Sequence, residues 1–439
     1  MTALMPVSAV TGGTTRRVSR LLAGLGYPPG LSGHERAYGP LRLPLRRPGR
    51  LVDVVEASGL TGRGGAGYPA GRKMRAVASG PGRKAVVANG AEGEPASRKD
   101  RLLLTRLPHL VLDGIALAAQ AVGADEAYLC VHGTEGALLG HLDRAVAERE
   151  AAGLDRDSVP IQVTGIPGRY VSSEQSSIVQ YLNGGPGKPT FSPPRPHERG
   201  VNGKPTLVHN VETLAHLALI ARHGDRWFRG TGLPSAPGSM LVTVSGAVTR
   251  PGVYEIEMGT TAGEVIVLAG GAAERLQALL VGGYFGAWLP VETAWPTPLT
   301  HSGLKAAGGV LGAGIVIAFP AAACPIAETA RVVRYLAEES AGQCGPCRFG
   351  LPALADALAS LAFFGDRGGS AHDVEALFPL VERRGACRHP DGAAQLGRSV
   401  FRAFPADVHW HRWQGACDGV RRPPLLPLPG DEEREWDWG

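Results

Sequence analysis

Helical periodicities and short apolar runs alternate along the first half of the chain. Apolar positions between residues 51 and 60 keep a helical period, and residues 110–122 show a second helical pattern. Residues 84–88, KAVVA, and residues 126–131 have the length and composition of buried strands. Because these helices and strands alternate, the pattern predicts an α/β domain with a mostly parallel sheet, which we place at residues 51–237.

The pattern changes after residue 237. Short strand-like runs around one helical segment predict a small α+β module at residues 238–300. Four amphipathic runs predict a helical bundle within residues 301–420. An uncharged run covers residues 306–327, but prolines and glycines bound its strand-length centre GIVIAF. That run therefore favours a buried strand over a membrane span.

The two ends of the chain differ from the middle in composition. Residues 1–50 are rich in Pro, Gly and Arg, which predicts a wrapping arm with one short helix around residues 18–25. Residues 421–439 carry prolines and then acidic side chains, which predicts a loose acidic tail. No positively charged segment precedes an apolar stretch at the start of the chain, which argues against a signal peptide.

Composition narrows the classes of function. The 439 residues include 45 basic and 40 acidic side chains, and this net charge of +5 is too dilute for a nucleic-acid binder. Six cysteines are too sparse for a disulfide scaffold in a chain of this length, which favours a reducing compartment. We therefore expect a cytoplasmic protein that does not itself span a membrane.

Two loops carry candidate ligand-binding chemistry. Residues 62–67 match the G-x-G-x-x-G string of dinucleotide sites, but a helix rather than a strand precedes them. Such a loop still lets the backbone approach a phosphate or a flat ring, with Arg63 and Lys73 as nearby cations, and the alternative is a packing turn. Glu92 and Glu94 follow a predicted strand, where α/β sheets place ligands, and the alternative for them is a solvated turn.

The string Cys344-Gly-Pro-Cys347 has three interpretations. One is a thiol-exchange centre, although the preceding segment is helical rather than a strand. Another is a zinc site of Cys344, Cys347 and Cys387, with His389 or Cys417 as the fourth ligand. The third is an iron-sulfur cluster on the same three cysteines. The spacing alone leaves all three open.

The remaining cysteines and histidines give weaker signals. His409 and His411 could both face one metal ion, but their position favours a surface strand or loop. Cys130 lies at the end of an apolar strand and is interpreted as a core thiol, and Cys324 receives the same interpretation.

Five strings occur together in a family-specific order. They are GRGGAGYPAGRK, NGAEGEPASRKD, RYVSSEQSSIV, GKPTLVHNVETL and SAGQCGPCRFG. In order and approximate spacing, the chain over residues 55–405 resembles the flavin-carrying, NADH-oxidising subunit of bacterial respiratory complex I, a module also found in NAD-linked hydrogenases and formate dehydrogenases. The resemblance implies an FMN-binding α/β domain, a β-grasp module of the soluble ligand-binding type at 238–300, and a four-helix domain carrying a 4Fe-4S cluster.

The resemblance also implies the site residues. Those expected to hold FMN are Arg63, Gly64, Gly65, Gly67, Lys73, Asn89, Val208, His209, Asn210 and Thr213. Glu92 and Glu94 take catalytic positions between the flavin and the nicotinamide nucleotide, and Tyr68 stands where the family stacks a phenylalanine on the adenine. The other residues expected to border the nucleotide are Tyr170, Glu174 and Gln175.

Several positions depart from the family's pattern. Ala91 replaces an acid expected near the flavin, and His209 replaces an asparagine. Gln175 replaces a glutamate associated with repelling the 2′-phosphate of NADPH, so the repulsion is removed. Ser192 and Arg195 replace a lysine and a phenylalanine, and the guanidinium could pair with a phosphate. We therefore hypothesise a relaxed or reversed preference between NADH and NADPH.

The cluster loop departs from the pattern as well. Ala341 stands where the family has its first cysteine, which leaves Cys344, Cys347 and Cys387 as the metal ligands. Three thiolates could hold a 3Fe-4S cluster, or a 4Fe-4S cluster whose fourth iron takes Ser340, a water molecule or Cys417. Loss of the cluster, with a residual CGPC string, is the remaining alternative.

Together these features predict a flavin-dependent NAD(P)H oxidoreductase. It would pass a hydride from NADH or NADPH to FMN, and then single electrons through the cluster to a ferredoxin-like or quinone-linked acceptor. Its partner would be an electron-transfer protein or a membrane-bound redox complex, which would place it peripherally on the inner face of the membrane. The alternatives are a non-catalytic binding or assembly module that keeps the fold, and a zinc-bound thiol protein.

Overall fold

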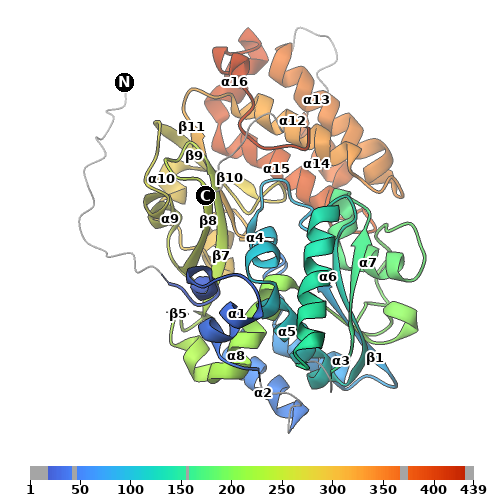
Figure 1. The fold of residues 1–439 in the computed structure, drawn as a ribbon. Helices are drawn as coiled ribbons and strands as arrows, with labels where there is room; N and C mark the ends of the chain where they lie inside the picture. Colours follow the sequence, from blue (N-terminus) through green and yellow to red (C-terminus); the bar gives the residue numbers. More distant parts are fainter. Residues whose placement is uncertain (1–17, 42–46, 155–157, 366–373, 431–439) are drawn as a thin grey trace.

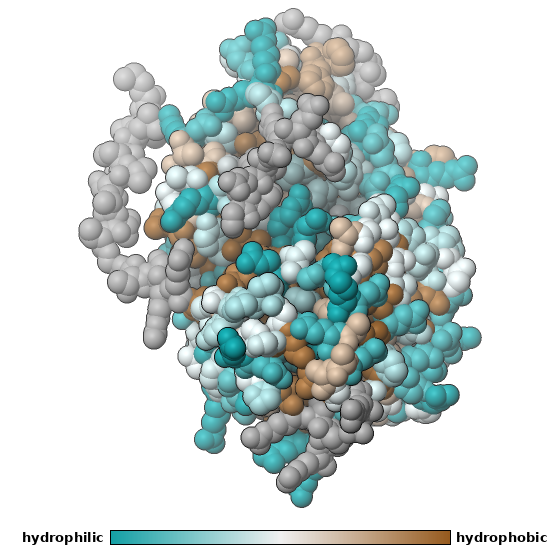
Figure 2. Space-filling model, viewed as in Figure 1, coloured by the Kyte–Doolittle hydropathy of each residue, from teal (hydrophilic) through white to brown (hydrophobic). Residues whose placement is uncertain are grey.

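The computed structural model describes residues 18–41, 47–154, 158–365 and 374–430 (Figure 1). It has an α/β domain, a smaller sheet beside it and a group of C-terminal helices that lies against both (Figure 1). On the face drawn in Figure 2, hydrophilic and intermediate residues predominate, and hydrophobic residues form separate groups. This layered arrangement agrees with the fold class that the sequence predicts.

The first domain contains a four-stranded sheet in the order β3-β2-β1-β4. Its strands are β1 (Lys84–Asn89), β2 (Ala124–His132), β3 (Ile161–Ile166) and β4 (Thr206–Asn210). All three pairings are parallel, which confirms the predicted parallel sheet. In the pairing of β1 with β4, Asn89 lies opposite Asn210, so the carboxyl ends of these two strands meet at one edge.

Helices cover this sheet and build its core. Helix α5 (Pro108–Val122) is buried at nearly every position and packs against α8 (Val211–Arg229). Helix α2 (Pro48–Ser58) also packs against both of these helices, as the apolar period over residues 51–60 predicts. The other helices of the domain are α3 (Ala70–Ala78), α4 (Lys99–Arg106), α6 (Gly136–Ala151) and α7 (Gln175–Leu182).

The second sheet has five strands in the order β10-β9-β11-β7-β8. They are β7 (Ser239–Gly246), β8 (Gly252–Glu257), β9 (Leu276–Val281), β10 (Ala287–Pro290) and β11 (Ile315–Pro320). Strand β11 is buried at all six positions, as expected for the GIVIAF run, but it lies between β9 and β7. The module therefore extends beyond the predicted boundary at residue 300. Its smaller elements are β5 (Gly232–Leu233), β6 (Ala236–Pro237), α9 (Ala262–Leu268), α10 (Val291–Ala294) and α11 (His301–Ala306).

In the described part of the C-terminal domain, the four predicted helices and one more are present. The expected four are α12 (Pro325–Glu338), α13 (Leu351–Phe363), α14 (Val374–Val381) and α15 (His389–Ala403). Residues Pro405–Gln414 form α16, so the interpretation of His409 and His411 as part of a surface strand or loop is wrong. The His411 side chain is fully buried against α13, because its turn of α16 faces the bundle, whereas His409 is exposed.

The N-terminal end of the described chain is hydrogen-bonded to the second sheet. The carboxylate of Glu255 accepts hydrogen bonds from the backbone amides of Arg20, Leu21 and Leu22 at 2.8, 2.9 and 3.0 Å. The predicted short helix is a single 3₁₀ segment, η1 (Leu22–Gly26), and α1 (Leu31–Tyr38) follows it. Residues 1–17 of the predicted arm lie outside the described part of the chain.

The segment after α16 is not the loose tail that its composition predicts. Leu426 is only 1% exposed, and the amides of Leu425 and Leu426 donate to the Glu328 carboxylate at 2.9 and 3.0 Å. The prolines prevent regular structure here, but the leucines among them are apolar enough to be buried. The acidic residues 431–439 lie outside the described residues.

Helices α4 and α5 form a bent pair that together reaches the length and hydropathy of a membrane span. Within the described ranges, no single helix has the length and hydropathy needed to cross a membrane.

Candidate functional site

The glycine loop packs against the carboxyl end of β4 and the first turn of α8. The backbone amide of Arg63 donates to Thr213 Oγ1 at 2.9 Å. A Cβ atom added to Gly64 would lie 3.2 Å from the Cβ of Asn210. Gly67 has φ +63° and approaches the His301 ring so closely that a Cβ would lie 2.2 Å from its Nε2. The loop therefore needs glycine for close approach, and its surface is mostly backbone.

The two predicted cations of this region have different surroundings. The buried Arg63 guanidinium donates to Thr61 Oγ1 and to the Ser239 carbonyl, each at 3.0 Å. It also lies 3.9 Å from the Glu212 carboxylate, and burial lowers its pKa. Arg63 is thus engaged by protein groups and ties the glycine loop to the second sheet. The expectation that its charge faces a phosphate has no geometric support.

Lys73, on α3, is the cation that remains available. Its Nζ donates to the Val208 carbonyl at 2.7 Å and to Gln175 Oε1 at 3.1 Å. An ammonium has three donors, so the described residues leave one of them for a ligand. Burial lowers the pKa of Lys73 to about 8, and nearby Glu174 opposes this shift. A buried cation with a free donor beside a glycine loop fits an anionic group such as a phosphate.

His209, on β4, is buried close to Lys73. Its Nε2 is fully buried and has no hydrogen-bond partner among the described residues. Burial and the neighbouring lysine lower the pKa of His209 to about 3, so its imidazole is neutral. An unpaired buried nitrogen is costly, and a bound ligand would remove that cost.

The two acidic residues of the EGEP loop have different roles. Glu92 accepts from the backbone amides of Asp100 and Arg101 at 3.1 and 3.0 Å, and so holds the start of α4. Glu94 is half-buried and accepts from the Tyr170 hydroxyl at 3.1 Å and from the Tyr284 amide at 2.8 Å. Burial raises the pKa of Glu94 to about 7, despite these hydrogen bonds. Glu94 is therefore the acid that can exchange a proton near neutral pH.

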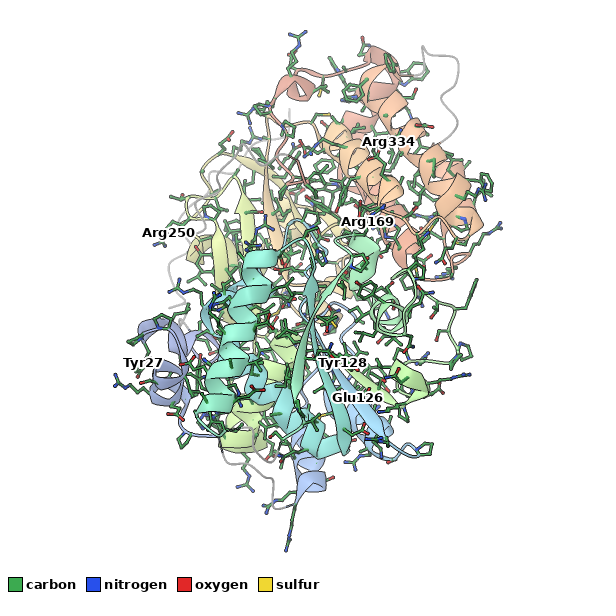
Figure 3. The ribbon with its side chains drawn as sticks, turned by 45° about the vertical axis from the view of Figure 1, so that its right-hand side comes forward. Tyr27, Glu126, Tyr128, Arg169, Arg250 and Arg334 are labelled. Atoms are coloured by element: carbon green, nitrogen blue, oxygen red, sulfur yellow. The ribbon has the colours of Figure 1, made fainter. Side chains whose placement is uncertain are left out.

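Tyr170 connects the first domain to the helical domain. Its ring centroid lies 5.0 Å from that of Phe285 and 5.5 Å from that of His389. Its backbone amide donates to Glu339 on the C-cap of α12 at 2.8 Å, and Arg169 pairs with the same carboxylate at 3.1 Å. Arg169, labelled in Figure 3, marks this junction with the C-terminal helices.

The other predicted nucleotide-site residues lie nearby or on the rim. The Glu174 carboxylate caps α7 by accepting from the Ser176 and Ser177 amides at 2.7 and 3.2 Å. Tyr68 is 51% exposed on the glycine loop, which suits stacking on a ligand. The Asn89 side chain donates to the Ser173 carbonyl at 2.8 Å.

A buried ionic cluster that the sequence motifs do not indicate lies beneath the site. Lys99 Nζ lies 2.7 Å from Asp100, 3.0 Å from Glu212 and 3.2 Å from Asn210 Oδ1. The Asn210 amide also donates to Asp100 at 2.6 Å, so protein partners hold this side chain. Burial raises the pKa of Asp100 to about 7, whereas the cations beside Glu212 lower the pKa of that carboxyl to about 2 against its burial. Adjacent charges in RKD, next to an apolar helix, were the only signal in the sequence.

The cysteine loop brings together the three predicted cluster ligands. Cys344 and Cys347 lie at the start of the short turn Pro346–Gly350 that leads into α13, and Cys387 precedes α15. Burial raises the pKa of the Cys347 thiol to about 12, and its hydrogen-bonded neighbour Cys344 and nearby Cys387 add to the shift. Three thiols from two segments are a ligand set that suits a cluster, and their role as its ligands stays a prediction.

Of the two candidates for a fourth ligand, Cys417 lies with a different group of side chains. Cys417 Sγ lies within 4.8 Å of Cys324 and His411 instead. His389 Nε2 donates to the Leu336 carbonyl at 2.6 Å, and burial lowers the pKa of its ring to about 4. Cys417 is therefore not a zinc ligand at this loop, nor a ligand to a fourth iron, whereas His389, whose Nδ1 has no hydrogen-bond partner among the described residues, stays a predicted zinc ligand. Cys130 is a buried core thiol as expected.

Comparisons with known proteins agree with this layout. Residues 55–219 match the Nuo51 FMN-binding domain, 241–283 the SLBB domain, and 327–411 the iron-sulfur binding region of NADH-ubiquinone oxidoreductase-F. The chain is 31% identical to an NADH-quinone oxidoreductase subunit of Rhizobium meliloti (strain 1021), over 84% of this chain and 90% of that protein. It is 33% identical to the corresponding subunit of Mycobacterium bovis (strain ATCC BAA-935 / AF2122/97), over 91% and 92%.

A solved structure shows the same architecture. It is a NAD+-reducing [NiFe]-hydrogenase in the air-oxidized state, with a TM-score of 0.80, 30% identity, and coverage of 90% of this chain and 67% of that one. The sequence identity to these proteins extends over most of this chain. Along this chain, the FMN-binding match comes first, the SLBB match second and the iron-sulfur match third. The chain belongs to the NADH-quinone oxidoreductase-F family, the FMN-binding subunits of these enzymes.

Proposed function

We propose that the protein oxidises NADH or NADPH at a bound FMN and delivers the electrons through an iron-sulfur cluster to a redox partner. FMN supplies the chemistry of accepting a hydride and releasing electrons singly, which joins a two-electron donor to a one-electron cluster. The observation that carries the proposal is the meeting of the glycine loop, Lys73 and the unpaired Nε2 of His209 at the carboxyl ends of β1 and β4. Family membership supports the same function.

Different residues of the site would contact different parts of FMN. The backbone of Gly64, Gly65 and Gly67 would line the flavin, and Lys73 would offer a positive charge for the phosphate. His209 offers a neutral nitrogen whose burial is otherwise uncompensated. The residues that position this surface are Arg63, Asn89, Val208, Asn210 and Thr213.

The nicotinamide nucleotide would lie along the acidic loop. Tyr68 offers an exposed ring for the adenine, and Glu94 is a carboxyl that holds or releases a proton near pH 7. Tyr170 orients that carboxyl, while Glu92 fixes the loop on which it lies.

Acceptance of NADPH is part of the proposal. Gln175 is neutral and its side-chain oxygen is held by Lys73, so no acid at this position repels a 2′-phosphate. Arg195 is exposed, with its backbone amide bonded to Glu198 at 2.7 Å, and its guanidinium can reach a ligand from the surface.

The ligands of the cluster would be Cys344, Cys347 and Cys387.

The acceptor is a redox partner, either a ferredoxin-like protein or a membrane-bound redox complex to which the chain attaches peripherally. The relatives named above are subunits of NADH-quinone oxidoreductases and part of a NAD+-reducing hydrogenase, which supports a partner of this kind.

One experiment tests the proposal. The protein is purified anaerobically, its flavin and iron are quantified, and visible spectra are recorded before and after NADH and then NADPH. We expect flavin bands that bleach with a nucleotide, and about three or four iron atoms per chain. A colourless, iron-free protein, after reconstitution with FMN, iron and sulfide, would instead support the non-catalytic module.

A further inference from the structure

A second group of metal-binding side chains lies apart from the cluster loop. Cys324 immediately precedes α12, His411 lies on α16, and Cys417 immediately precedes the short 3₁₀ segment Asp418–Arg421. Their ligand atoms all lie within 4.8 Å of one another, and Cys324 Sγ is 3.3 Å from His411 Nε2. Two parts of the chain that are distant in sequence, Cys324 and the segment from His411 to Cys417, thus bring two sulfurs and one imidazole nitrogen to a common point.

The separations suit one tetrahedral ion. With bond lengths of about 2.3 Å to sulfur and about 2.1 Å to nitrogen, two ligands of a tetrahedral zinc lie about 3.5 to 3.8 Å apart. The Cys324–His411 separation of 3.3 Å lies close to those values and the other two separations do not exceed 4.8 Å, so small side-chain rotations would complete the site. Soft thiolates with an imidazole form a ligand set that selects zinc over hard cations such as magnesium.

The surroundings orient the ligands as metal sites require. His411 Nδ1 lies 3.3 Å from the Leu361 carbonyl, so donation to that oxygen leaves Nε2 as the lone-pair nitrogen facing the sulfurs. The Ala327 amide donates to Cys324 Sγ at 3.4 Å in the first turn of α12, which holds this sulfur in place. Cys324 and His411 are buried whereas Cys417 is half-buried, so an ion can enter from the Cys417 side.

We propose that Cys324, His411 and Cys417 bind a structural zinc ion, with a water molecule in the fourth position. The cluster ligands Cys344, Cys347 and Cys387 take no part in it. The ion would fasten the C-terminal segment to α12 and α16.

The segment after Cys417 is the element that such a site would secure. It continues to Leu425 and Leu426, whose amides donate to Glu328 on α12, and to Pro427, whose carbonyl accepts from the Tyr284 hydroxyl. The backbone amide of Tyr284 in turn donates to Glu94 at 2.8 Å. A metal ion at Cys417 would therefore anchor the segment that is hydrogen-bonded to Tyr284, the residue whose amide holds Glu94 in the acidic loop.

The test measures metal content rather than activity. A variant with Cys344, Cys347 and Cys387 changed to serine is purified anaerobically, incubated with Zn²⁺, desalted and analysed for zinc. We expect about one zinc per chain to remain, because the proposed ligands are untouched. Adding Cys417→Ser should lower retained zinc at least about tenfold, and this half-buried thiol can be replaced with little change to the core.

Two further measurements make the result decisive. His411→Gln should lose zinc, while His409→Gln on the exposed side of the same helix should keep it. Co²⁺ in place of zinc should give sulfur-to-metal charge-transfer bands that disappear with Cys417→Ser. Absence of retained zinc in the triple-serine variant, equal retention in the Cys417→Ser variant, or a Cys324–Cys417 disulfide in the anaerobic protein would each overturn the proposal.

Discussion

The Tyr170 hydroxyl donates a hydrogen bond to the half-buried Glu94 carboxylate at 3.1 Å. This contact joins the acidic loop after β1 to the aromatic group formed by Tyr170, Phe285 and His389 at the helical domain. Because Glu94 titrates near neutral pH, the phenol influences the protonation state of the carboxyl that we place beside the nucleotide.

Tyr170→Phe is expected to raise the pKa of Glu94 above its value of about 7, because the hydrogen bond favours the ionised form. A hydrogen bond to a charged group of about 1.5 kcal/mol corresponds to roughly one pH unit. The midpoint of the pH profile for NADH-driven dye reduction should rise by about that much. Tyr128→Phe, at the remote position labelled in Figure 3, should leave the profile in place. An unchanged midpoint in Tyr170→Phe would show that Glu94 does not govern the profile.

Glu94→Gln is expected to change the pH dependence of stability. The folded state raises the pKa of this carboxyl, so its stabilising contribution is complete below pH 4.5 and is lost as the pH rises through about 7. Glutamine cannot ionise, so the variant avoids this loss. The melting temperature of Glu94→Gln relative to wild type should therefore rise between pH 5 and pH 8, as measured by circular dichroism. A difference that stays constant with pH would contradict the assignment.

Lys73→Met is expected to weaken retention of FMN. The substitution removes the available buried donor at the glycine loop, and a charge-assisted hydrogen bond of about 1.5–3 kcal/mol corresponds to a roughly 10- to 100-fold weaker flavin affinity. Flavin released during gel filtration measures the effect. Lys84→Met, at the start of β1, is the matched control, because that Nζ bonds only to the Gly82 carbonyl among described residues. Equal flavin retention in the two variants would remove Lys73 from the phosphate site.

Gln175→Glu is expected to lower activity with NADPH relative to NADH. The new carboxylate would pair with Lys73 and present a negative charge to a 2′-phosphate. The ratio of kcat/KM for the two nucleotides is the measurement, and Gln162→Glu on β3 of the same domain is the control for added charge. If wild type is inert to NADPH and Gln175→Glu leaves the NADH rate unchanged, the proposed relaxed preference is wrong.

Local pattern in the sequence predicts those parts of the fold that local interactions build. The parallel sheet and α5 follow from short apolar runs and helical periods, which depend on neighbouring residues. The boundary at residue 300 is wrong because β11 joins its sheet by pairing with β7, from which three strands and three helices separate it in the chain. Periodicity indicates a strand but not its partner.

Long-range side-chain contacts are likewise hidden from the sequence. The motifs identify Lys73 and Glu94 but not their environment. Their hydrogen-bond partners, Val208 for Lys73 and Tyr170 and Tyr284 for Glu94, lie far away in sequence. Arg63 shows the converse. A cation in a glycine loop suggests a contact with a phosphate, but the Arg63 guanidinium instead bonds to the Ser239 carbonyl and lies beside the Glu212 carboxylate. Cys417 follows the cluster cysteines in sequence and yet meets Cys324, which precedes them.

The position of β11 also affects the order in which the chain can fold during synthesis. Strands β7 and β8 pair as one hairpin and β9 and β10 as another, and both emerge from the ribosome before β11. Until β11 arrives, each hairpin exposes the strand edge that β11 later occupies, and such open edges are prone to pairing with other chains. A nascent chain arrested before residue 315 should therefore be more prone to aggregation than one released after residue 320.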